Sequence, residues 1–566
     1  MKNKNNKPQY RFRRMIVLSV FTLLISGLFY RALDMQVLNQ AFFQQQGDAR
    51  HIRTVPISAH RGDIYDRNGE PLAISTPVDT VWINPKEFTG FQKVSSLAKV
   101  LNLNSVHLKN KIQKHAAKEF IYIRRQVSPD VGVKVAELGL KGVYLRREYK
   151  RYYPTGEVAS HVLGFANVDD QGQEGLELAY DDWLTGEAGA KKVIRDRKGQ
   201  VVDDVERIRP AQPGQSIHLS IDRRIQYLAY SALKASVKQN KAIAGSAVVL
   251  DVHTGEVLAM VNQPSFNAND RSQLRPGVYR NRSVTDVFEP GSTMKPFTIA
   301  AALETGKWHP TDNVHTSPGR YKVQGSLIKD MKDYGKLNLG GIILKSSNVG
   351  VSKVALSIGQ EQQLEMYTKL GFGFDTGSGF PGERSGNLRV SNVSDFERAT
   401  MSFGYSLSVT PLQLARAYAA LAANGTIYPV TFLKREDEAQ GEKIMSANTA
   451  KKVRRMMERV VSAEGTAKKA SIANYTVAGK TGTVHKFVSG GYADDRYLSV
   501  FAGMVPASNP QLVMVVMLNE PRNGEYFGGQ VAAPVFSKVM SGALRLLDVE
   551  PDNLKYAQTV KKGKSA

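Results

Sequence analysis

A serine followed three residues later by a lysine can act as a nucleophile and its base, and this chain contains four such pairs. The four serines are Ser96, Ser231, Ser292 and Ser326. Only Ser292 directly follows a Pro-Gly break and opens a run of helix-forming residues. Pro296 supports a helix start there, because a residue without an N–H is tolerated in the first turn. We therefore expect Ser292 and Lys295 to lie on one helix face, within reach of each other.

A base role requires Lys295 to be uncharged near neutral pH. The positive end of a helix and partial burial both disfavour the ammonium form of a lysine. A Ser-Lys pair is an alternative to the Ser-His-Asp arrangement, so none of the ten histidines is needed. The pair could therefore act as a nucleophile and its base, and we expect neither a cofactor nor a metal ion.

Two further motifs could complete such a site. Ser346-Ser347-Asn348 is one of four Ser-x-Asn strings and indicates little alone. Lys480-Thr481-Gly482-Thr483 contains the only Lys-Thr-Gly string. It follows a predicted strand, Tyr475 to Ala478, and a glycine there would let a substrate backbone approach the strand edge. An exposed turn lysine is the commoner explanation of a lone string, so the motifs have to be weighed together.

The N-terminus has the pattern of a membrane anchor. Residues 1–14 hold six Lys and Arg and no acid, and a mostly apolar, uncharged run follows from Met15 to Tyr30. At about 1.5 Å per residue this run is short for a bilayer, so we expect the helix to continue to about Leu38. The pattern predicts a transmembrane anchor over 15–38, a cytoplasmic tail over 1–14 and all later residues outside the cytoplasm. A cleaved signal peptide is the alternative, but no small-x-small cleavage pattern follows Tyr30.

Composition excludes several classes of function. The net charge of +24 could indicate a nucleic-acid binder, but the predicted location puts DNA out of reach, and we expect no nucleic acid. An anionic polymer or anionic lipid head groups would suit the charge, and a merely soluble basic surface explains it equally well. The absence of cysteine excludes disulfides, thiolate zinc sites, iron–sulfur clusters and a cysteine nucleophile.

The region 39–215 mixes short strand-like runs with turns and predicts a β-rich pedestal. Residues 61–68 read as a strand entering an Asn-Gly turn, and residues 72–74 as the strand leaving it. The charged side chains of this stretch, together with Asn68, could contact a partner or form a buried ion-pair network, and we favour the network. They are Arg61, Asp63, Asp66 and Arg67.

The region 216–550 predicts one α/β/α domain, followed by a basic tail over 551–566. A long amphipathic helix should start after Asp222, and another at Thr410-Pro411. Strands at both ends of the region, with helices between them, suggest an antiparallel sheet built from sequence-distant parts beside an all-helical lobe. The expected strands are 247–250, 257–260, 475–478, 497–503 and 512–518, and a closing helix is expected over 531–547.

Taken in order, the motifs at Ser292, Ser346 and Lys480 resemble the signature of the penicillin-recognising serine transferases. Residues 61–73, 288–297 and 404–415 are similar to class B penicillin-binding proteins of the division-type (septal) branch, and the resemblance covers essentially the whole chain. It implies a multidomain α/β protein with a single transmembrane helix, an elongated β-rich pedestal of the dimerisation type and a C-terminal penicillin-binding transpeptidase domain. In that domain an antiparallel five-stranded sheet would lie beside the helical lobe.

The resemblance also implies roles in acyl transfer on the D-Ala-D-Ala end of peptidoglycan stem peptides. Ser292 would attack the carbonyl carbon and form an ester, with Lys295 accepting its proton. Ser346 would relay a proton to the leaving amine, and Asn348 would bind the peptide amide. Backbone N–H groups of Ser292 and Thr483 would form the oxyanion hole. The terminal carboxylate would be bound by Lys480, Thr481 and Thr483, and Gly482 would be a substrate-binding residue of the same strand.

The same resemblance implies the surroundings of the protein. It would be a single-pass protein of the bacterial cytoplasmic (inner) membrane, with a periplasmic or extracytoplasmic catalytic domain. Its substrates would be stem peptides and lipid-linked nascent glycan, and β-lactams would inhibit it. Its membrane partners would be the septal glycan polymerase and other division proteins.

Several rival functions use the same residues. An elongation-type class B transpeptidase, a D-alanine carboxypeptidase and a β-lactamase would all acylate Ser292, although a long pedestal favours a polymer substrate. A bifunctional polymerase would need a further domain with a Glu-Asp-x-x-Phe string, which the sequence lacks. A non-enzymatic, wall-sensing division scaffold is disfavoured because Ser292, Lys295 and Lys480 are all present.

Overall fold

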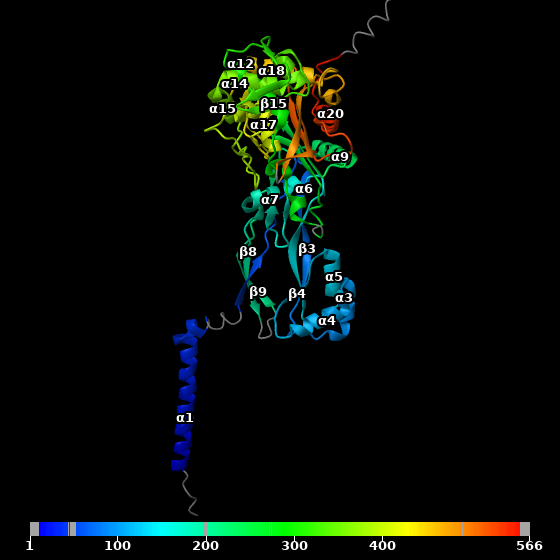
Figure 1. Cartoon of the computed structure of the whole chain (residues 1–566). Helices are drawn as coiled ribbons and strands as arrows, with labels where there is room; N and C mark the ends of the chain where they lie inside the picture. The colour runs from blue at the N-terminus through cyan, green and yellow to red at the C-terminus, as the bar shows by residue number, and fades with distance from the viewer. Residues whose placement is uncertain are drawn as a thin grey trace, which may run out of the picture. The chain divides into compact units, whose positions relative to one another are not determined.

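The computed structural model describes residues 11–43, 45, 52–195, 201–270, 272, 274–488 and 491–554. The chain divides into two compact units (Figure 1). The first comprises Met1–His60, Pro77–Tyr149 and Gly186–Pro213, and the second comprises Arg61–Thr76, Lys150–Thr185 and Gly214–Ala566. Residues 1–10 and 555–566, which make up most of the two predicted basic tails, lie outside the described residues.

The N-terminal helix α1 (Arg11–Leu33) continues through a π-helical turn, Asp34–Leu38, as the apolar pattern predicted. Within the described residues Arg11–Leu38 is the helix that is long and apolar enough to cross a membrane, with a mean hydropathy of 2.0. Arg31 forms a 2.9 Å ion pair with Asp34 near the end of this apolar stretch. A helix of this length and composition at the N-terminus suggests a membrane anchor.

The first unit combines short sheets with helices. Strand β1 (Ile52–Ile57) pairs with β8 (Gly189–Arg195), which pairs with β9 (Val201–Arg209), all antiparallel. A separate core lies between strands and three short helices that the turn-rich sequence did not predict. α4, for example, buries only Leu108 and Ile112, too short an apolar stripe to stand out. The elements of this core are residues 77–83 of β3 (Pro71–Ile83), β4 (Ile121–Val127), α3 (Val94–Val100), α4 (Ser105–Lys114) and α5 (Pro129–Glu137).

The second unit is built on the predicted five-stranded antiparallel sheet, in the order β12-β11-β21-β20-β19. The order brings the early strands beside the last ones in the sequence. The predicted strand over Tyr475 to Ala478 is wrong: Tyr475 makes only an isolated bridge to Ile472, and the strand begins at Ala478. The five strands are β11 (Ala244–Asp251), β12 (Val257–Gln263), β19 (Ala478–Val488), β20 (Gly491–Val505) and β21 (Leu512–Asn519).

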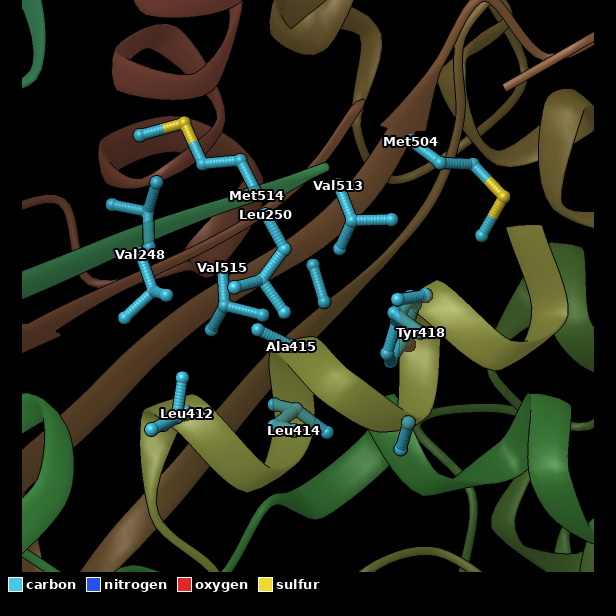
Figure 2. Packing of buried hydrophobic residues seen from close by; sticks show 14 of the residues in the cluster. Val248, Leu250, Leu412, Leu414, Ala415, Tyr418, Met504, Val513, Met514 and Val515 are labelled. Atoms are coloured by element: carbon cyan, nitrogen blue, oxygen red, sulfur yellow. The ribbon is translucent and has the colours of Figure 1, made fainter. Parts of the chain in front are cut away.

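Helices cover both faces of this sheet. α17 (Pro411–Ala422) packs on β11 and β21, and Figure 2 shows Leu412 and Ala415 beside Leu250 and Val515. α9 (Arg223–Gln239) and α20 (Ala533–Leu546) pack on each other and on the sheet. The predicted helix starts are confirmed, since the side chains of Asp222 and Thr410 cap α9 and α17.

The helical lobe lies between the two groups of strands in the sequence. It also carries two small two-stranded sheets: β13 (Asn313–His315) pairs with β16 (Lys336–Asn338), and β14 (Arg320–Val323) pairs with β15 (Ser326–Lys329). The lobe helices are α12 (Lys295–Glu304), α13 (Leu339–Lys345), α14 (Asn348–Ile358), α15 (Gln360–Lys369), α16 (Asp395–Met401) and α18 (Ala447–Val461).

A buried ion-pair network holds the segments 61–76 and 150–185 together inside the second unit. The Arg61 guanidinium donates to Glu177 at 2.8 Å and to Asp181 at 2.7 Å. Arg151 donates to the other carboxylate oxygen of Glu177 at 2.6 Å. The side chains of Arg61, Arg151 and Glu177 are at most 1% exposed. Arg61 is therefore a structural residue, as the network interpretation expected.

Glu177→Ala should lower the free energy of unfolding of the second unit by about 3–5 kcal/mol, because two buried guanidinium groups lose their shared carboxylate. Glu70→Ala is the matched control. It removes a 3.2 Å pair with Arg223 whose side chains are about half exposed, and such pairs contribute about 1 kcal/mol or less. Denaturant unfolding compares the two variants, and equal midpoints would contradict a stabilising role for the network.

Candidate active site

Ser292 and Lys295 lie on consecutive turns, as the motif predicted. Ser292 belongs to the 3-10 turn Gly291–Met294, and Lys295 opens α12. The Lys295 Nζ to Ser292 Oγ distance is 2.5 Å, and Lys295 is fully buried. Gly291 has a φ of +58°, and a Cβ there would lie 2.4 Å from Val484. Only glycine allows the nucleophile turn to approach β19 this closely.

Ser346 and Asn348 reach the same place from the junction of two helices. Ser346 follows the last residue of α13 with a φ of +58°, and Asn348 is the first residue of α14. The Ser346 hydroxyl donates to Ser292 Oγ at 3.0 Å. Lys295 Nζ lies 3.3 Å from Ser346 Oγ and 2.8 Å from Asn348 Oδ1. A non-glycine residue with positive φ is costly and is maintained by its surroundings.

The third motif lies inside β19 rather than after a strand. Lys480 Nζ donates to Ser346 Oγ at 3.0 Å and to the Thr481 carbonyl at 3.1 Å, and Lys480 is fully buried. The space beside Gly482, expected to admit substrate, is occupied by the chain itself: a Cβ there would lie 3.0 Å from the Pro290 carbonyl oxygen. Gly482 therefore brings the motif strand against the nucleophile turn.

A cleft of about 510 Å³ opens on these residues. Ser292, Ser346 and Asn348 line it together with Thr481 and Thr483. The two residues predicted to supply oxyanion N–H groups, Ser292 and Thr483, thus face one cavity. Sequence reasoning had placed the three motifs in one site, and the structure brings all three together.

The protonation of the two lysines follows from their burial. Burial, and then the charge of Lys480, lower the pKa of Lys295 well below its usual value, while the Asp330 carboxylate opposes that shift. Burial lowers the pKa of Lys480 to about 7. Lys295 is therefore suited to accept the Ser292 proton near neutral pH, and Lys480 changes its charge close to neutrality.

Sequence reasoning missed residues that support these motifs. Thr466 shares a 2.8 Å hydrogen bond with Thr481, and the Gly528 N–H donates to Thr483 Oγ1 at 3.1 Å. Asp330 accepts hydrogen bonds from the Ser346 to Val349 turn. None of them belongs to a recognisable motif, and each is brought in by tertiary structure, so the sequence alone carried no signal for them.

The geometry defines a class of protein: a serine acyltransferase in which a buried lysine takes the place of histidine. The family model described as penicillin binding protein transpeptidase domain matches residues 245–541. The model described as penicillin-binding protein dimerisation domain matches residues 56–219.

Similar proteins cover nearly the full chain. The chain is 43% identical over 539 residues to the peptidoglycan D,D-transpeptidase FtsI of Escherichia coli strain K12, covering 94% of this chain and 91% of that protein. It is 40% identical over 558 residues to the probable peptidoglycan D,D-transpeptidase PbpC of Pseudomonas aeruginosa, covering 98% of each. The chain belongs to the class B penicillin-binding proteins.

Solved structures agree with this assignment. The apo transpeptidase domain of Burkholderia pseudomallei penicillin-binding protein 3 is 45% identical with a TM-score of 0.55, covering 59% of this chain and 97% of that one. A peptidoglycan synthetase from Bifidobacterium adolescentis is 25% identical with a TM-score of 0.71, covering 88% of this chain and 97% of that one. The second match extends over both family domains.

The predicted carboxylate-binding role of Lys480 implies that Lys480→Met reduces the acylation efficiency of a β-lactam that carries a carboxylate about 10- to 100-fold, because the charge-assisted hydrogen bond would be lost. The ester analogue of the same β-lactam should lose less, because it is affected only through the hydrogen bond from Lys480 to Ser346. Lys480 is charged below its pKa of about 7, so the wild-type preference for the carboxylate should fall as pH rises through that value. Acylation rates measured with both ligands between pH 5.5 and 9 check this.

The matched control is Lys345→Met, because Lys345 lines the same cleft but is exposed. An exposed charge contributes little, so this variant should keep the preference for the carboxylate. If Lys480→Met lost acylation efficiency equally with the carboxylate and the ester ligand, carboxylate binding by Lys480 would be contradicted.

Proposed function

We propose that this protein is a membrane-anchored serine D,D-transpeptidase that cross-links peptidoglycan stem peptides at the division septum. One observation carries the proposal. The Ser292 hydroxyl lies within hydrogen-bond distance of both Lys295 Nζ and Ser346 Oγ, and Lys480 Nζ holds Ser346 from the other side. This arrangement supplies a nucleophile, a base and a proton path in one cleft.

The first half-reaction forms an acyl-enzyme. Ser292 Oγ attacks the carbonyl carbon between the two D-alanines, and its proton passes to Lys295 Nζ. The oxyanion is held by N–H groups of Ser292 and Thr483, each donor contributing a factor of about 10²–10³. The C–N bond then breaks, and the leaving amine receives a proton through Ser346. The terminal D-alanine departs, and the rest of the stem peptide remains bound to Ser292 as an ester.

The second half-reaction transfers the acyl group to an amine of a neighbouring strand. The amine attacks the ester carbonyl, loses a proton to the Ser346 and Lys295 pair, and Ser292 Oγ leaves and takes up a proton. One peptide bond is broken and one is formed, so the ester intermediate retains most of the free energy of the cleaved bond. Cross-linking therefore needs no nucleotide outside the membrane.

Location and partners follow from the anchor and the relatives. We place the N-terminus in the cytoplasm and the catalytic domain outside the inner membrane, because the basic flank precedes the apolar helix. In the domain division that the sequence predicts, residues 39–215 would form the pedestal and residues 216–550 the transpeptidase domain. The septal role is supported by the similarity to FtsI of Escherichia coli. Its partners would be lipid-linked nascent glycan, the septal glycan polymerase and other division proteins.

Ser292→Ala should abolish the covalent β-lactam adduct while leaving the fold intact. Intact-mass spectrometry after incubation with a β-lactam, followed by peptide mapping, measures adduct and site. Ser326→Ala is the matched control: it disrupts a second Ser-x-x-Lys string, at the exposed start of β15. It should acylate as the wild type does. Stoichiometric acylation of Ser292→Ala would remove the proposed nucleophile.

Transpeptidation is separated from its rivals by the fate of the acyl group. A donor peptide ending in D-Ala-D-Ala, given to the full-length protein with an amine acceptor, should yield a new amide that depends on Ser292. Release of free acid alone would indicate a carboxypeptidase, and no turnover with no β-lactam adduct would indicate a scaffold. Depletion in cells should give filaments if the role is septal, whereas rounded cells would indicate the elongation type.

A further inference from the structure

The hairpin formed by β14 and β15 gathers positive charge on one exposed face. Arg320 lies directly opposite Lys329, and directly opposite residues of an antiparallel pair share one face. Lys322 is two residues along from Arg320 and therefore lies on the same face. All three side chains are exposed, whereas Ile328 on the other face is 3% exposed. The hairpin sequence, residues 320–329, contains no acidic residue.

The three cations have no partner that would explain them within the fold. Arg320, Lys322 and Lys329 form no ion pair with any residue that the structure describes. Like charges that lie directly opposite each other on paired strands are destabilising. The arrangement of Arg320 beside Lys329 therefore weakens the hairpin, which indicates that these charges serve contacts outside the fold.

The base of this hairpin adjoins the active site. The Lys329 carbonyl accepts a hydrogen bond from Asn348 Nδ2 at 3.1 Å. The chain then continues through Lys332 and Tyr334, which line the 510 Å³ cleft together with Ser346. Positive charge thus extends from the hairpin face to the lining of the cleft.

The acceptor amine enters the cleft by the path that the leaving amine takes. In the proposed mechanism Ser346 protonates the leaving amine, and the same group takes a proton from the incoming one when the ester is consumed. Both amines therefore lie beside Ser346. The charged residues that line this cleft are Lys332, Lys345 and Glu464, so cations outnumber acids there.

An acceptor stem peptide has the charge that complements the hairpin face. The proposed donor ends in a free carboxylate, and a neighbouring strand of the same polymer carries the same peptides. Each acceptor is therefore a chain that bears carboxylates as well as an amine. Clustered cations raise the association rate of an anionic ligand by about 10- to 1,000-fold, and salt screens this effect.

We propose that the face formed by Arg320, Lys322 and Lys329 binds carboxylates of the acceptor stem peptide and guides its amine to the ester on Ser292. The inference rests on the proposed function and adds to it the binding surface and chemical class of the acceptor. The three side chains touch no reacting atom. They favour transfer to the amine over hydrolysis, because an acceptor held near the cleft reaches the ester before water does.

The triple variant Arg320→Gln, Lys322→Gln and Lys329→Gln removes the charges and keeps polar side chains. Full-length protein receives a D-Ala-D-Ala donor and one of two acceptors, a stem peptide with free carboxylates or the same peptide with its carboxylates converted to amides. The ratio of new amide to free acid is measured with each acceptor at about 50 mM and about 500 mM salt. The wild type should prefer the carboxylate acceptor at low salt, and the triple variant should lose about 3- to 10-fold of that preference.

Lys238→Gln, Lys451→Gln and Lys538→Gln together form the matched control. These lysines lie on α9, α18 and α20, are exposed, and do not line the cleft. The control loses the same three charges and should keep the wild-type preference. The hairpin variant should melt no lower than the wild type, because a like-charge pair is removed. Lys322→Gln alone should give a smaller loss in the same direction, and it decides if the triple variant does not fold.

The proposal is overturned if the hairpin variant keeps the wild-type preference, or if high salt leaves that preference unchanged. A face that binds an acidic protein or an anionic lipid instead would give the first result, since neither is present in the assay. An equal fall with both acceptors would also overturn it, because a damaged site does not distinguish charge. Failure of the proposed function is distinct, since wild-type protein would then form no amide with either acceptor.

Discussion

Two buried lysine ammonium groups repel each other around one serine hydroxyl. Lys295 Nζ and Lys480 Nζ lie 3.3 Å and 3.0 Å from Ser346 Oγ, and both side chains are fully buried. Burial removes the water that stabilises an ammonium ion, and the second positive charge adds repulsion. Loss of a proton by Lys295, whose pKa is lowered by burial and by Lys480, would relieve this repulsion and leave an amine beside Ser292. The proposed reactivity of Ser292 depends on that loss.

The rest of the second unit keeps the two lysine side chains buried and close to each other. A five-stranded sheet brings β19 to the edge where the nucleophile turn lies, and α13 and α14 bring the second serine from the helical lobe. Gly291 and Gly482 allow the turn and the strand to approach closely, because a Cβ on Gly291 would lie 2.4 Å from Val484 and a Cβ on Gly482 would lie 3.0 Å from the Pro290 carbonyl oxygen. Close packing excludes water from the Lys295 and Lys480 side chains, and this desolvation keeps the pKa values of both lysines low.

The sequence predicted the elements that local rules govern. Asp222 and Thr410 were read as caps from residue type and spacing, and the anchor from its uninterrupted apolar run. The three motifs came together as their order and resemblance implied. Other features depend on contacts between distant segments: Asp330 caps a helix that starts 18 residues later, and Glu177 pairs with an arginine 116 residues away. The start of β19 was misplaced because apolar residues before it lie in a turn rather than in the sheet.

The protonation state of Lys295 tests the account most directly. A titration of the full-length protein labelled with ¹³C at the lysine Cε atoms, with the Lys295 signal assigned from its absence in Lys295→Met, reports that state by NMR. The account predicts a midpoint well below 10.5, the ordinary value for lysine, so that Lys295 is largely uncharged when Ser292 is acylated. A Lys295 that titrates at the ordinary lysine value would contradict it, because Ser292 would then have no base.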